Sequence, residues 1–383
     1  MKQIKIVSYY SDEYSADRRT GSPAAINVIN YISDVFGKIG YLTEVISPSW
    51  IISGGKGFCA GEKVELGEGK ILIKAPSFRK NTGATAFFNK AISRLWITCY
   101  LLRNVKRNET IFLYHAPSLM LPINILRAIK KPRIIIAAEE LYSDIPRFAK
   151  LDREKEIRFL KRQEGYVFPT ELLRDRLCEN KPYVIIHGTY RVEPERESGF
   201  DDGKIHVLYA GTLNLLKGGA AAAAAAAEYL DERYHVHIIG FGNEDEKKEI
   251  LDKIEQIKNR TKAELSFDGL KTGEEYIRFL QSCHIGLSTQ NPAAGYNETS
   301  FPSKVLSYLS NGLRVVSIRI KALECSAVSD LLYYYDEDTP QSIAQAIAAV
   351  DTAEKYDSRS FIARLDERAC RGMNEMVGKI ENG

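Results

Sequence analysis

Residues 291–317 read NPAAGYNETSFPSKVLSYLSNGLRVVS. The first part is rich in Asn, Gly, Thr and Ser, which predicts a loop, and Pro302 suits the first turn of a helix. Gly312 is placed to end that helix in the left-handed conformation. The run LRVVS that follows predicts a buried strand. Loop, helix and buried strand in this order form one step of an alternating α/β fold.

The same alternation extends through both halves of the chain. The strand-like runs of the second half are KIHVLYAG, YHVHIIGFG, AELSFDG, CHIGLST, LRVVSIRI and LLYYYD. Those of the first half are IKIVSYY, YLTEVIS, ETIFLYH, RIIIAAEE, GYVFP and YVIIHG. Helical patterns lie between them, including residues 23–39, with Ser22 as the expected N-cap, and the alanine run 220–227. This pattern predicts an α/β protein with two parallel sheets, each in a Rossmann-like domain, facing a cleft.

The length of 383 residues favours two domains over a single core. The polar stretch 187–204, HGTYRVEPERESGFDDGK, has three Gly, one Pro and eight charged residues, which is typical of a linker. We therefore expect an N-terminal domain over 1–187, a linker over 188–202 and a second domain over 203–350.

The net charge of +3 conceals an asymmetry between the halves. Residues 1–190 contain 30 Lys and Arg against 19 Asp and Glu, and the remainder contains 23 against 31. A basic first half suits an anionic lipid surface or a phosphate-bearing acceptor, and no nucleic-acid motif accompanies the charge. The segment 86–107, AFFNKAISRLWITCYLLRNVKR, is either an interfacial membrane helix or a surface helix packed on the core.

Composition also bounds the compartment and the cofactors. No stretch has the roughly 18 apolar residues of a membrane span, and the first residues do not resemble a signal peptide. The six cysteines form no Cys-x-x-Cys pair, and the six histidines show no metal-ligand spacing. We expect a cytoplasmic protein with reduced thiols and no metal.

Glycines and lysines at predicted strand ends indicate an anion site in the second half. In LYAGTLNLLKGG (208–219), Gly211 and Thr212 form a turn, and Lys217 precedes the helix of alanines. A lysine beside the free amides of a helix N-terminus binds anions, although an ordinary Gly-rich turn is the alternative. Lys304 and the amides of Ser300 and Phe301 offer a second such group. Glycines after the next two strands leave room for a ligand near the backbone: Gly240, Gly242 and Gly269, the last followed by Leu270.

Candidate residues of the first half also follow predicted strands. The loop SADRRTGSPAA (15–25), which precedes a helix, has three acceptor or phosphate candidates, Asp17, Arg18 and Arg19, and one donor-binding candidate, Gly21. It lacks Gly-x-Gly-x-x-Gly, and an ordinary loop is the alternative. The catalytic candidates are His115, Glu139 and Glu140, at the ends of TIFLYH and RIIIAAEE. A histidine that caps the backbone, or glutamates that are only solvated, are the alternatives.

The order AGTLNLLKGG, IIGFGN, FDGL, FPSKVLSYLSNGLRVVS resembles the donor domain of GT-B glycosyltransferases, in particular retaining, family-4-like (group 1) enzymes of bacterial surface-polysaccharide assembly. The resemblance covers residues 205–350, and the first half more loosely through HGTY and AAEELYSDI. It implies a UDP-sugar donor, a glycan or lipid-linked acceptor, transfer with retention and no metal cofactor. It also implies that the C-terminal helices, 351–383, return to the first domain.

The chain departs from the family pattern around the nucleotide. Ser307 stands where the family has its ribose-binding glutamate, and Thr299 replaces the earlier glutamate, with Glu298 one place away. Thr212 replaces an arginine, whereas Lys217 and Lys304 remain. The diphosphate pocket is therefore expected to be kept, while ribose meets a neutral hydroxyl that forms a weaker hydrogen bond.

Three other functions stay open at this point. A nucleotide-sugar epimerase shares the architecture and needs carboxylates in the cleft. A non-catalytic nucleotide-sugar-binding protein would explain the missing ribose glutamates. A dehydrogenase is disfavoured because the dinucleotide glycine fingerprint is absent.

Overall fold

The computed structural model describes residues 2–12, 17–53, 55–67, 69–79, 83–145, 148, 150–178, 180–197, 199–214, 218–292 and 300–383. The chain divides into two compact units. The first comprises Met1–Ile186 together with Glu367–Gly383, and the second comprises His187–Asp366. The segment expected as a linker, 188–202, is thus grouped with the second unit, as are residues 351–366.

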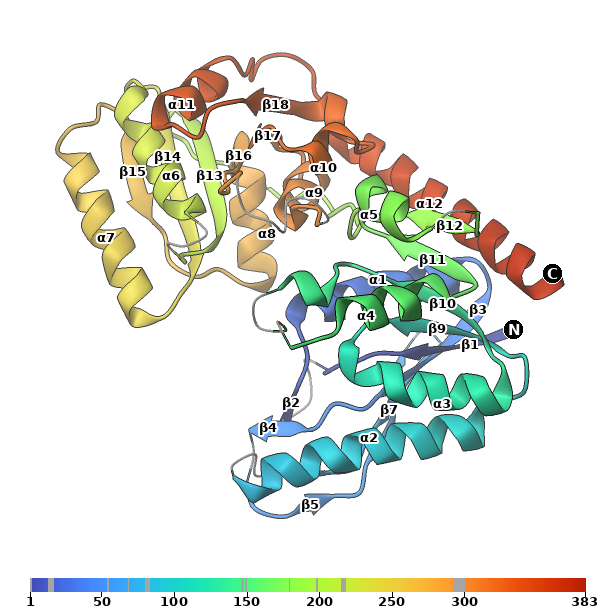
Figure 1. Cartoon of the computed structure of the whole chain (residues 1–383). Helices are drawn as coiled ribbons and strands as arrows, with labels where there is room; N and C mark the ends of the chain where they lie inside the picture. Colours follow the sequence, from blue (N-terminus) through green and yellow to red (C-terminus); the bar gives the residue numbers. More distant parts are fainter. Residues whose placement is uncertain are drawn as a thin grey trace. The chain divides into compact units, whose positions relative to one another are not determined.

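The first unit is built on an eight-stranded sheet in the order β12-β11-β10-β9-β1-β3-β7-β6 (Figure 1). All neighbouring strands are parallel except β6 and β7, which are antiparallel. The strands are β1 Lys2–Val7, β3 Tyr41–Ser47, β6 Glu62–Gly67, β7 Lys70–Lys74, β9 Thr110–Tyr114, β10 Arg133–Ala137, β11 Gly165–Phe168 and β12 Tyr183–Ile185. The six strands predicted for the first half are all present.

The region 51–78 contains short strands that the sequence did not predict. Besides β6 and β7, two two-stranded ribbons form, one from β2 Arg18–Arg19 and β4 Ile51–Ser53, the other from β5 Phe58–Cys59 and β8 Ser77–Phe78. Closely spaced glycines and alternating charges in this region obscure the two-residue periodicity, which is why the pattern gave no signal.

Helices cover both faces of the first sheet. They are α1 Pro23–Lys38, α2 Ala84–Asn104, α3 Met120–Lys130, α4 Arg153–Lys161 and α5 Glu171–Leu177. On β9, Phe112 packs against Phe36 of α1 at 5.7 Å between ring centroids, whereas its neighbours Ile111 and Leu113 join a core cluster with α2 to α5. Successive strand residues point to opposite faces, so α1 covers one face and α2 to α5 the other. Ser22 is the N-cap of α1 but forms no side-chain cap hydrogen bond.

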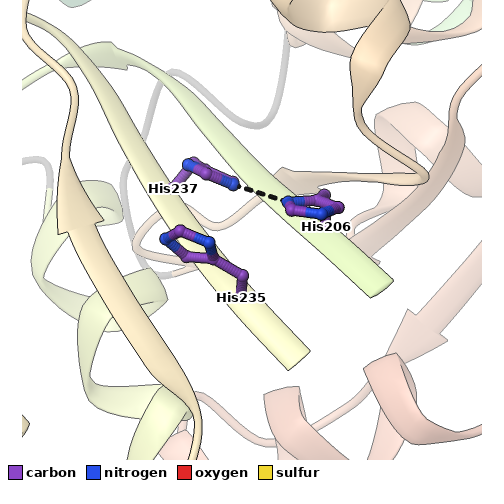
Figure 2. A group of neighbouring side chains, drawn as sticks. All are labelled: His206, His235 and His237. Atoms are coloured by element: carbon purple, nitrogen blue, oxygen red, sulfur yellow. Dashed lines mark hydrogen bonds between the residues drawn. The ribbon is translucent and has the colours of Figure 1, made fainter. Parts of the chain in front are cut away.

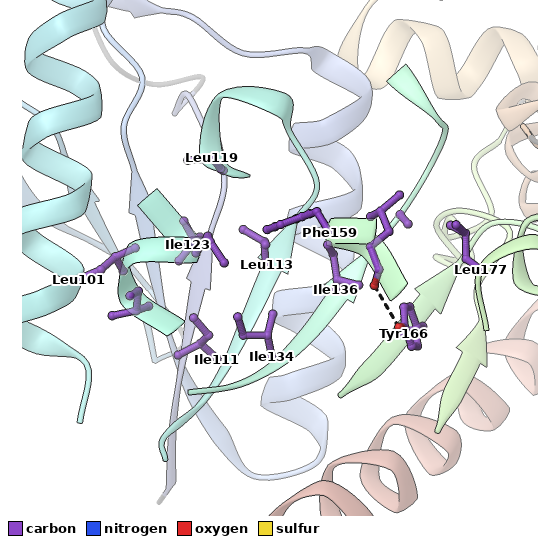
Figure 3. Close-up of a cluster of buried hydrophobic side chains, with 14 of the residues drawn as sticks. Leu101, Ile111, Leu113, Leu119, Ile123, Ile134, Ile136, Phe159, Tyr166 and Leu177 are labelled. Atoms are coloured by element: carbon purple, nitrogen blue, oxygen red, sulfur yellow. Dashed lines mark hydrogen bonds between the residues drawn. The ribbon is translucent and has the colours of Figure 1, made fainter. Parts of the chain in front are cut away.

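The main apolar cluster of the first unit lies on the face covered by α2 to α5 (Figure 3). Ile123 of α3 and Phe159 of α4 pack on Leu113 of β9 and Ile136 of β10, and all four are fully or almost fully buried. Burying side chains of this size stabilises the fold by about 1.5–3 kcal/mol each before entropy is counted. The cluster holds β9 and β10 in place, and these strands precede the candidate residues of this unit.

The C-terminal helix α12, Ser358–Asn382, completes the first unit with its last turns. Gly165 of β11 has no room for a side chain there, because an added Cβ would lie 2.5 Å from Ile380 and 3.2 Å from Met376. Glu381 accepts a hydrogen bond from Lys2 at 2.6 Å, and its carbonyl accepts one from Arg133 at 3.1 Å. The end of the chain is thereby fastened to β1, β10 and β11.

The second unit is a six-stranded parallel sheet in the order β15-β14-β13-β16-β17-β18. Its strands are β13 Ile205–Thr212, β14 Tyr234–Phe241, β15 Glu264–Phe267, β16 Ile285–Ser288, β17 Arg314–Ile318 and β18 Leu332–Tyr335. They match the six strands predicted for the second half. The chain moves outward from β13 to β15 and then returns to β16 on the other side of β13. Ligands bind beyond the carboxyl ends of strands at such a switch point.

Each of these strands is followed along the chain by an α-helix: α6 Gly219–Ala226, α7 Glu244–Lys258, α8 Gly273–Ser282, α9 Ser303–Ser310, α10 Lys321–Glu324 and α11 Pro340–Ala348. The alanine run forms α6, whose small side chains pack between α7, α11 and the sheet (Figure 1). Helix α9 begins one residue later than expected, with Pro302 as its N-cap. Gly312 follows the C-cap with φ +87°, as predicted.

None of the helices in the described part of the chain combines the length and the apolar composition that a membrane crossing requires.

Candidate functional site

Three predicted glycines lie side by side at the carboxyl ends of β13, β14 and β15. Gly211 pairs with Gly240, and the Gly240 amide donates to the Gly269 carbonyl at 3.0 Å. A Cβ on Gly240 would lie 1.7 Å from the Gly211 carbonyl oxygen, and its φ of +151° also favours glycine. These three partly exposed positions form a glycine surface, in which the backbone carries no side chains. Leu270, next along the chain, is 60% exposed.

Lys304 lies beside Gly211, at one end of this surface. Its Nζ is 3.9 Å from the centroid of the Tyr209 ring, and a Cβ on Gly211 would be 3.1 Å from the same Nζ. The structure thus brings together Lys304 and Gly211, which are separated by nearly a hundred residues. A cation over an aromatic face is held by about 0.5–2 kcal/mol, so the ammonium is positioned before any ligand arrives.

The N-terminus of α6 adjoins the same tyrosine. A Cβ on Gly219 would lie 2.4 Å from the Thr289 carbonyl and 2.8 Å from the Tyr209 ring. Only glycine lets the helix start so close to the ends of β13 and β16. The first amides of α6 and the Lys304 ammonium therefore converge near Tyr209, and both attract negative charge.

Tyr308 fixes helix α9, and with it Lys304, on the sheet. Its hydroxyl accepts a hydrogen bond from the Ala210 amide at 2.8 Å and donates to the Leu287 carbonyl at 3.3 Å. Its ring lies on Gly286, where an added Cβ would be 2.4 Å away. Sequence reasoning missed this role, because the aromatic position looks like any core residue of an amphipathic helix.

Phe301 packs inward rather than toward a ligand. Its ring stacks on His187 at 4.8 Å, and His187 Nε2 accepts a hydrogen bond from the Ala327 amide at 3.2 Å. The Phe301 side chain is therefore engaged in packing, and only its backbone amide remains for a ligand. The prediction likewise used only the backbone amide of Ser300. The histidine of HGTY has a structural partner here that the sequence did not identify.

Ser307, the residue predicted to meet ribose, has a second hydroxyl beside it. Its Oγ lies 3.3 Å from the hydroxyl of Tyr276, which comes from α8. Burial raises the pKa of Tyr276, so the phenol stays neutral. A pair of neutral hydroxyls, one of them missed by sequence reasoning, stands where the family pattern has a carboxylate.

The remaining donor candidates have local roles or lie outside the described residues. The Thr212 carbonyl accepts from the Tyr209 hydroxyl at 3.1 Å. Gly242 adjoins Glu246, the N3 residue of the capping box that begins α7. The described residues do not include Lys217, Glu298 or Thr299.

In the first unit, His115 is buried and paired with Glu156. Its Nε2 lies 2.8 Å from Glu156 Oε1, and the Glu156 carboxylate also accepts the amides of Tyr142 and Ser143 at 2.9 Å each. Although burial opposes it, hydrogen bonding keeps the pKa of Glu156 below its usual value. In the neutral ring, a carboxylate at Nε2 leaves Nδ1 as an acceptor, and Nδ1 has no hydrogen-bond partner within the described residues. The sequence did not identify Glu156.

Glu139 and Glu140 are half-buried and follow β10 directly. Burial, reinforced by the charge of Glu140, raises the pKa of Glu139 to about 8. Burial and the Glu156 charge also raise the pKa of Glu140. Glu139 is therefore largely a neutral acid at pH 7, able to donate a hydrogen bond or a proton.

The two arginines of the first loop differ in their surroundings. Arg19 is buried, and its Nη1 donates to the carbonyls of Ser49 and Ala75 at 2.7 and 2.9 Å. Its guanidinium is thus used inside the unit, while Arg18 is exposed. Asp17 forms an ion pair with Arg79. A side chain at Gly21 would meet only ordinary contacts, 3.4 Å or more away.

Three histidines that are separate in the sequence come together in the structure. His206, His235 and His237 lie together at the amino ends of β13 and β14 (Figure 2). The sequence signal was a histidine near the start of successive strands, in IHVLYA, YHVHII and CHIGLS. This signal indicates a histidine cluster only when the order and register of the strands are known.

The architecture defines the fold class of the protein. Two α/β units with parallel sheets give this chain the GT-B fold of nucleotide-sugar glycosyltransferases, as predicted. The sequence matches no family model and no curated protein.

Three solved structures illustrate the likeness. One is the Anabaena protein HepE in complex with UDP and glucose, with TM-score 0.61, 11% identity and 100% of each chain covered. A second is an α,α-trehalose-phosphate synthase (UDP-forming) from Burkholderia xenovorans with glucose-6-phosphate, with TM-score 0.60, 11% identity and 99% and 100% coverage. The third is a trehalose-6-phosphate synthase studied for glycosyltransfer with retention, with TM-score 0.60, 12% identity and 99% of each chain covered. At these identities the likeness establishes the fold.

Proposed function

We propose that the protein is a glycosyltransferase that moves a sugar from a UDP-sugar to a glycan or lipid-linked acceptor with retention. The observation that carries this proposal is the position of Lys304 over the Tyr209 ring and beside Gly211, where the glycine surface begins at the switch point of the second sheet. A fixed cation beside a glycine-lined surface suits a nucleotide diphosphate.

The donor diphosphate would bind to Lys304 and to the first amides of α6. When the glycosidic bond to the donor breaks, negative charge grows on the leaving phosphate. A cation and helix amides already in place stabilise that charge without reorganising, which lowers the barrier. Lys304 is therefore assigned to binding and to leaving-group stabilisation.

The nucleoside would lie on the glycine surface, with its ribose at Ser307 and Tyr276. Their hydroxyls are 3.3 Å apart and neutral. A neutral hydrogen bond contributes about half as much as one to a carboxylate, so ribose recognition relies on two such groups.

Acceptor-side chemistry is assigned to the first unit. His115 has a buried acceptor nitrogen fixed by Glu156, and Glu139 is a carboxylic acid held neutral by burial. His115 can accept a hydrogen bond and Glu139 can donate one. A sugar hydroxyl, which both donates and accepts, is oriented by such groups. The names of the similar structures, which include UDP, glucose and transfer with retention, support the donor type and the stereochemistry proposed here.

We further place the protein in the cytoplasm at an anionic membrane surface, through the exposed face of α2. Phe87, Phe88 and Leu95 are 71%, 53% and 68% exposed on this helix. The basic residues Lys90, Arg94 and Arg103 are exposed beside them. Aromatic and basic residues together suit the interface of an anionic bilayer, where a lipid-linked acceptor would be found.

The proposal is tested by nucleotide binding and by product analysis. UDP or a UDP-sugar at millimolar concentration should raise the melting temperature more than NAD or ATP does. Incubation with UDP-sugars should release UDP when a suitable acceptor is present. An isomerised UDP-sugar without acceptor would indicate an epimerase, and binding without turnover a non-catalytic protein. The absence of a thermal shift with any uridine, guanosine or thymidine diphosphate would refute the donor site.

A further inference from the structure

Four of the six histidines gather at the amino edge of the second sheet, opposite the glycine surface. His206 of β13 pairs in register with His235 of β14, which in turn pairs with Glu264 of β15. His237 follows two residues later on the same face. His284 lies beside them, with its Nδ1 accepting the His206 amide at 3.0 Å. This group takes no part in the proposed donor site.

Carboxylates fix the protons on two of these rings. Asp202 Oδ1 lies 2.9 Å from His206 Nε2, and Asp268 Oδ2 lies 3.0 Å from His237 Nδ1. An ionised carboxylate only accepts hydrogen bonds, so in the neutral rings the proton lies on Nε2 of His206 and on Nδ1 of His237. The other nitrogen of each ring then presents a lone pair.

Those two lone pairs face each other. His206 Nδ1 and His237 Nε2 are 2.8 Å apart (Figure 2), and both rings are buried. Two acceptors at this distance repel, unless a positive ion is placed between them. The nitrogens of two histidines bound to one tetrahedral zinc ion are about 3.4 Å apart, given Zn–N distances of about 2.0–2.1 Å. A separation of the two rings by about half an ångström would admit such an ion.

The surroundings have the features of a metal site. Metal-bound histidines usually donate their second nitrogen to a carboxylate, as His206 and His237 do here. Asp202, Glu264 and Asp268 bring three negative charges, and Lys204 pairs with Glu264. A divalent cation would balance the remaining excess. The Phe200 ring lies 3.9 Å from His206 and 5.1 Å from His237, centroid to centroid, and shields the pair from water.

His235 supplies a third nitrogen. One ligand atom from each of His206, His235 and His237 lies within 4.8 Å of the other two. The His235 ring stacks on His237 at 3.9 Å, with its Nε2 3.0 Å from Ser266 Oγ. Rotation of this partly exposed ring about its side-chain torsions turns a nitrogen toward the pair. We propose that His206, His235 and His237 bind one divalent transition-metal ion of the zinc type, which fastens β13 to β14.

The proposal is tested on the full chain after treatment with EDTA. Titration with Zn²⁺ in a calorimeter should show one site per chain, and Zn²⁺ should raise the melting temperature. Co²⁺ should give the visible absorption of a histidine-bound ion at the same stoichiometry. His206→Ala and His237→Ala should abolish both signals. Asp268→Asn should weaken Zn²⁺ binding by about 10- to 100-fold, as loss of an outer partner does.

His284→Asn is the matched control, because its amide oxygen can still accept the His206 N–H, and it should bind Zn²⁺ like the unmodified protein. No stoichiometric binding of Zn²⁺ or Co²⁺ would overturn the proposal and assign the close nitrogens to a shared proton. Equal Zn²⁺ binding by His206→Ala and His237→Ala would also overturn it. If those variants do not fold, Zn²⁺ binding is compared between Asp202→Asn, Asp268→Asn and the unmodified protein, and both variants should bind Zn²⁺ more weakly. None of these readouts depends on sugar transfer.

Discussion

At the scale of single residues, the proposed donor site depends most directly on Lys304. Replacing Lys304 with alanine removes a charge-assisted contact to phosphate, which is worth roughly 1.5–3 kcal/mol. We expect UDP-sugar affinity to fall by about 10- to 150-fold and transfer to slow. Calorimetry with UDP measures the first effect. Lys321→Ala, a similar change on the exposed surface of α10, should leave the affinity unchanged. Wild-type UDP affinity in Lys304→Ala would remove the basis of the donor site.

Ser307 tests how ribose is bound. Ser307→Ala should cost only roughly 0.5–1.5 kcal/mol, because it removes a neutral hydrogen bond. Ser307→Glu restores the carboxylate of the family pattern, and Tyr276, whose hydroxyl is 3.3 Å from Ser307 Oγ, can donate to it. If ribose binds at this position, UDP affinity should be kept or improved. A loss of UDP binding in Ser307→Glu, with the fold intact by circular dichroism, would place the ribose elsewhere.

Glu139 gives the protein a pH dependence whose sign can be derived. Its pKa is about 8 in the folded protein, against an ordinary value of 4.5. Between these two pH values the native state keeps a proton that the unfolded chain has lost, so stability falls as pH rises. The slope is at most about 1.4 kcal/mol per pH unit.

The variant Glu139→Gln, which cannot ionise, should remove that slope. Urea denaturation at pH 5 and pH 9 compares it with the unmodified protein, and Glu154→Gln, on the exposed side of α4, is the control. Between pH 5 and pH 9, we expect Glu139→Gln to lose less stability than the unmodified protein and less than Glu154→Gln. An equal loss in all three proteins would contradict the burial of Glu139.

At the scale of elements, the exposed face of α2 is the surface that we propose binds the membrane. We expect the protein to co-sediment with vesicles that contain anionic lipid, and to dissociate as salt rises, because screening weakens the attraction of basic residues. Lys90→Ala combined with Arg94→Ala should reduce binding, and Leu95→Ser should reduce it further. Lys247→Ala with Lys248→Ala on α7 is the control for lost charge. Equal recovery on neutral and anionic vesicles would reject this role.

The elements also show what sequence could predict. The strands were predictable because each is a short apolar run between turn residues, and the ends of β13 and β14 were marked by Gly211 and Gly240. The histidine site was not, because His206 and His235 are 29 positions apart and meet only through strand register. The Ser307–Tyr276 pair and the His115–Glu156 pair escaped for the same reason. Helical and strand periods report which face is buried, and they carry no information on which faces meet.

At the scale of the whole molecule, the first unit needs the last residues of the chain. The buried side chains of this segment are Ala369, Met373, Met376, Val377 and Ile380. We expect Ile380→Ala, which leaves a cavity against Gly165, to lower the free energy of unfolding by about 2–4 kcal/mol. A chain ending at Asp366 should aggregate or unfold. The exposed Lys379→Ala change is the control, and urea denaturation is the measurement. Unaltered stability in Ile380→Ala would show that the helix end contributes little.

The first unit is assembled from both ends of the chain, whereas the second is continuous. No single stretch of gene therefore encodes the first unit alone. Lys2 and Glu381 are joined by a 2.6 Å ion pair, so the two termini lie next to each other (Figure 1). A circularly permuted gene that starts at His187 and joins residue 383 to residue 1 through a short linker would encode each unit as one uninterrupted segment. In that reordered chain the two halves of the protein could be expressed, stabilised and evolved as separate modules.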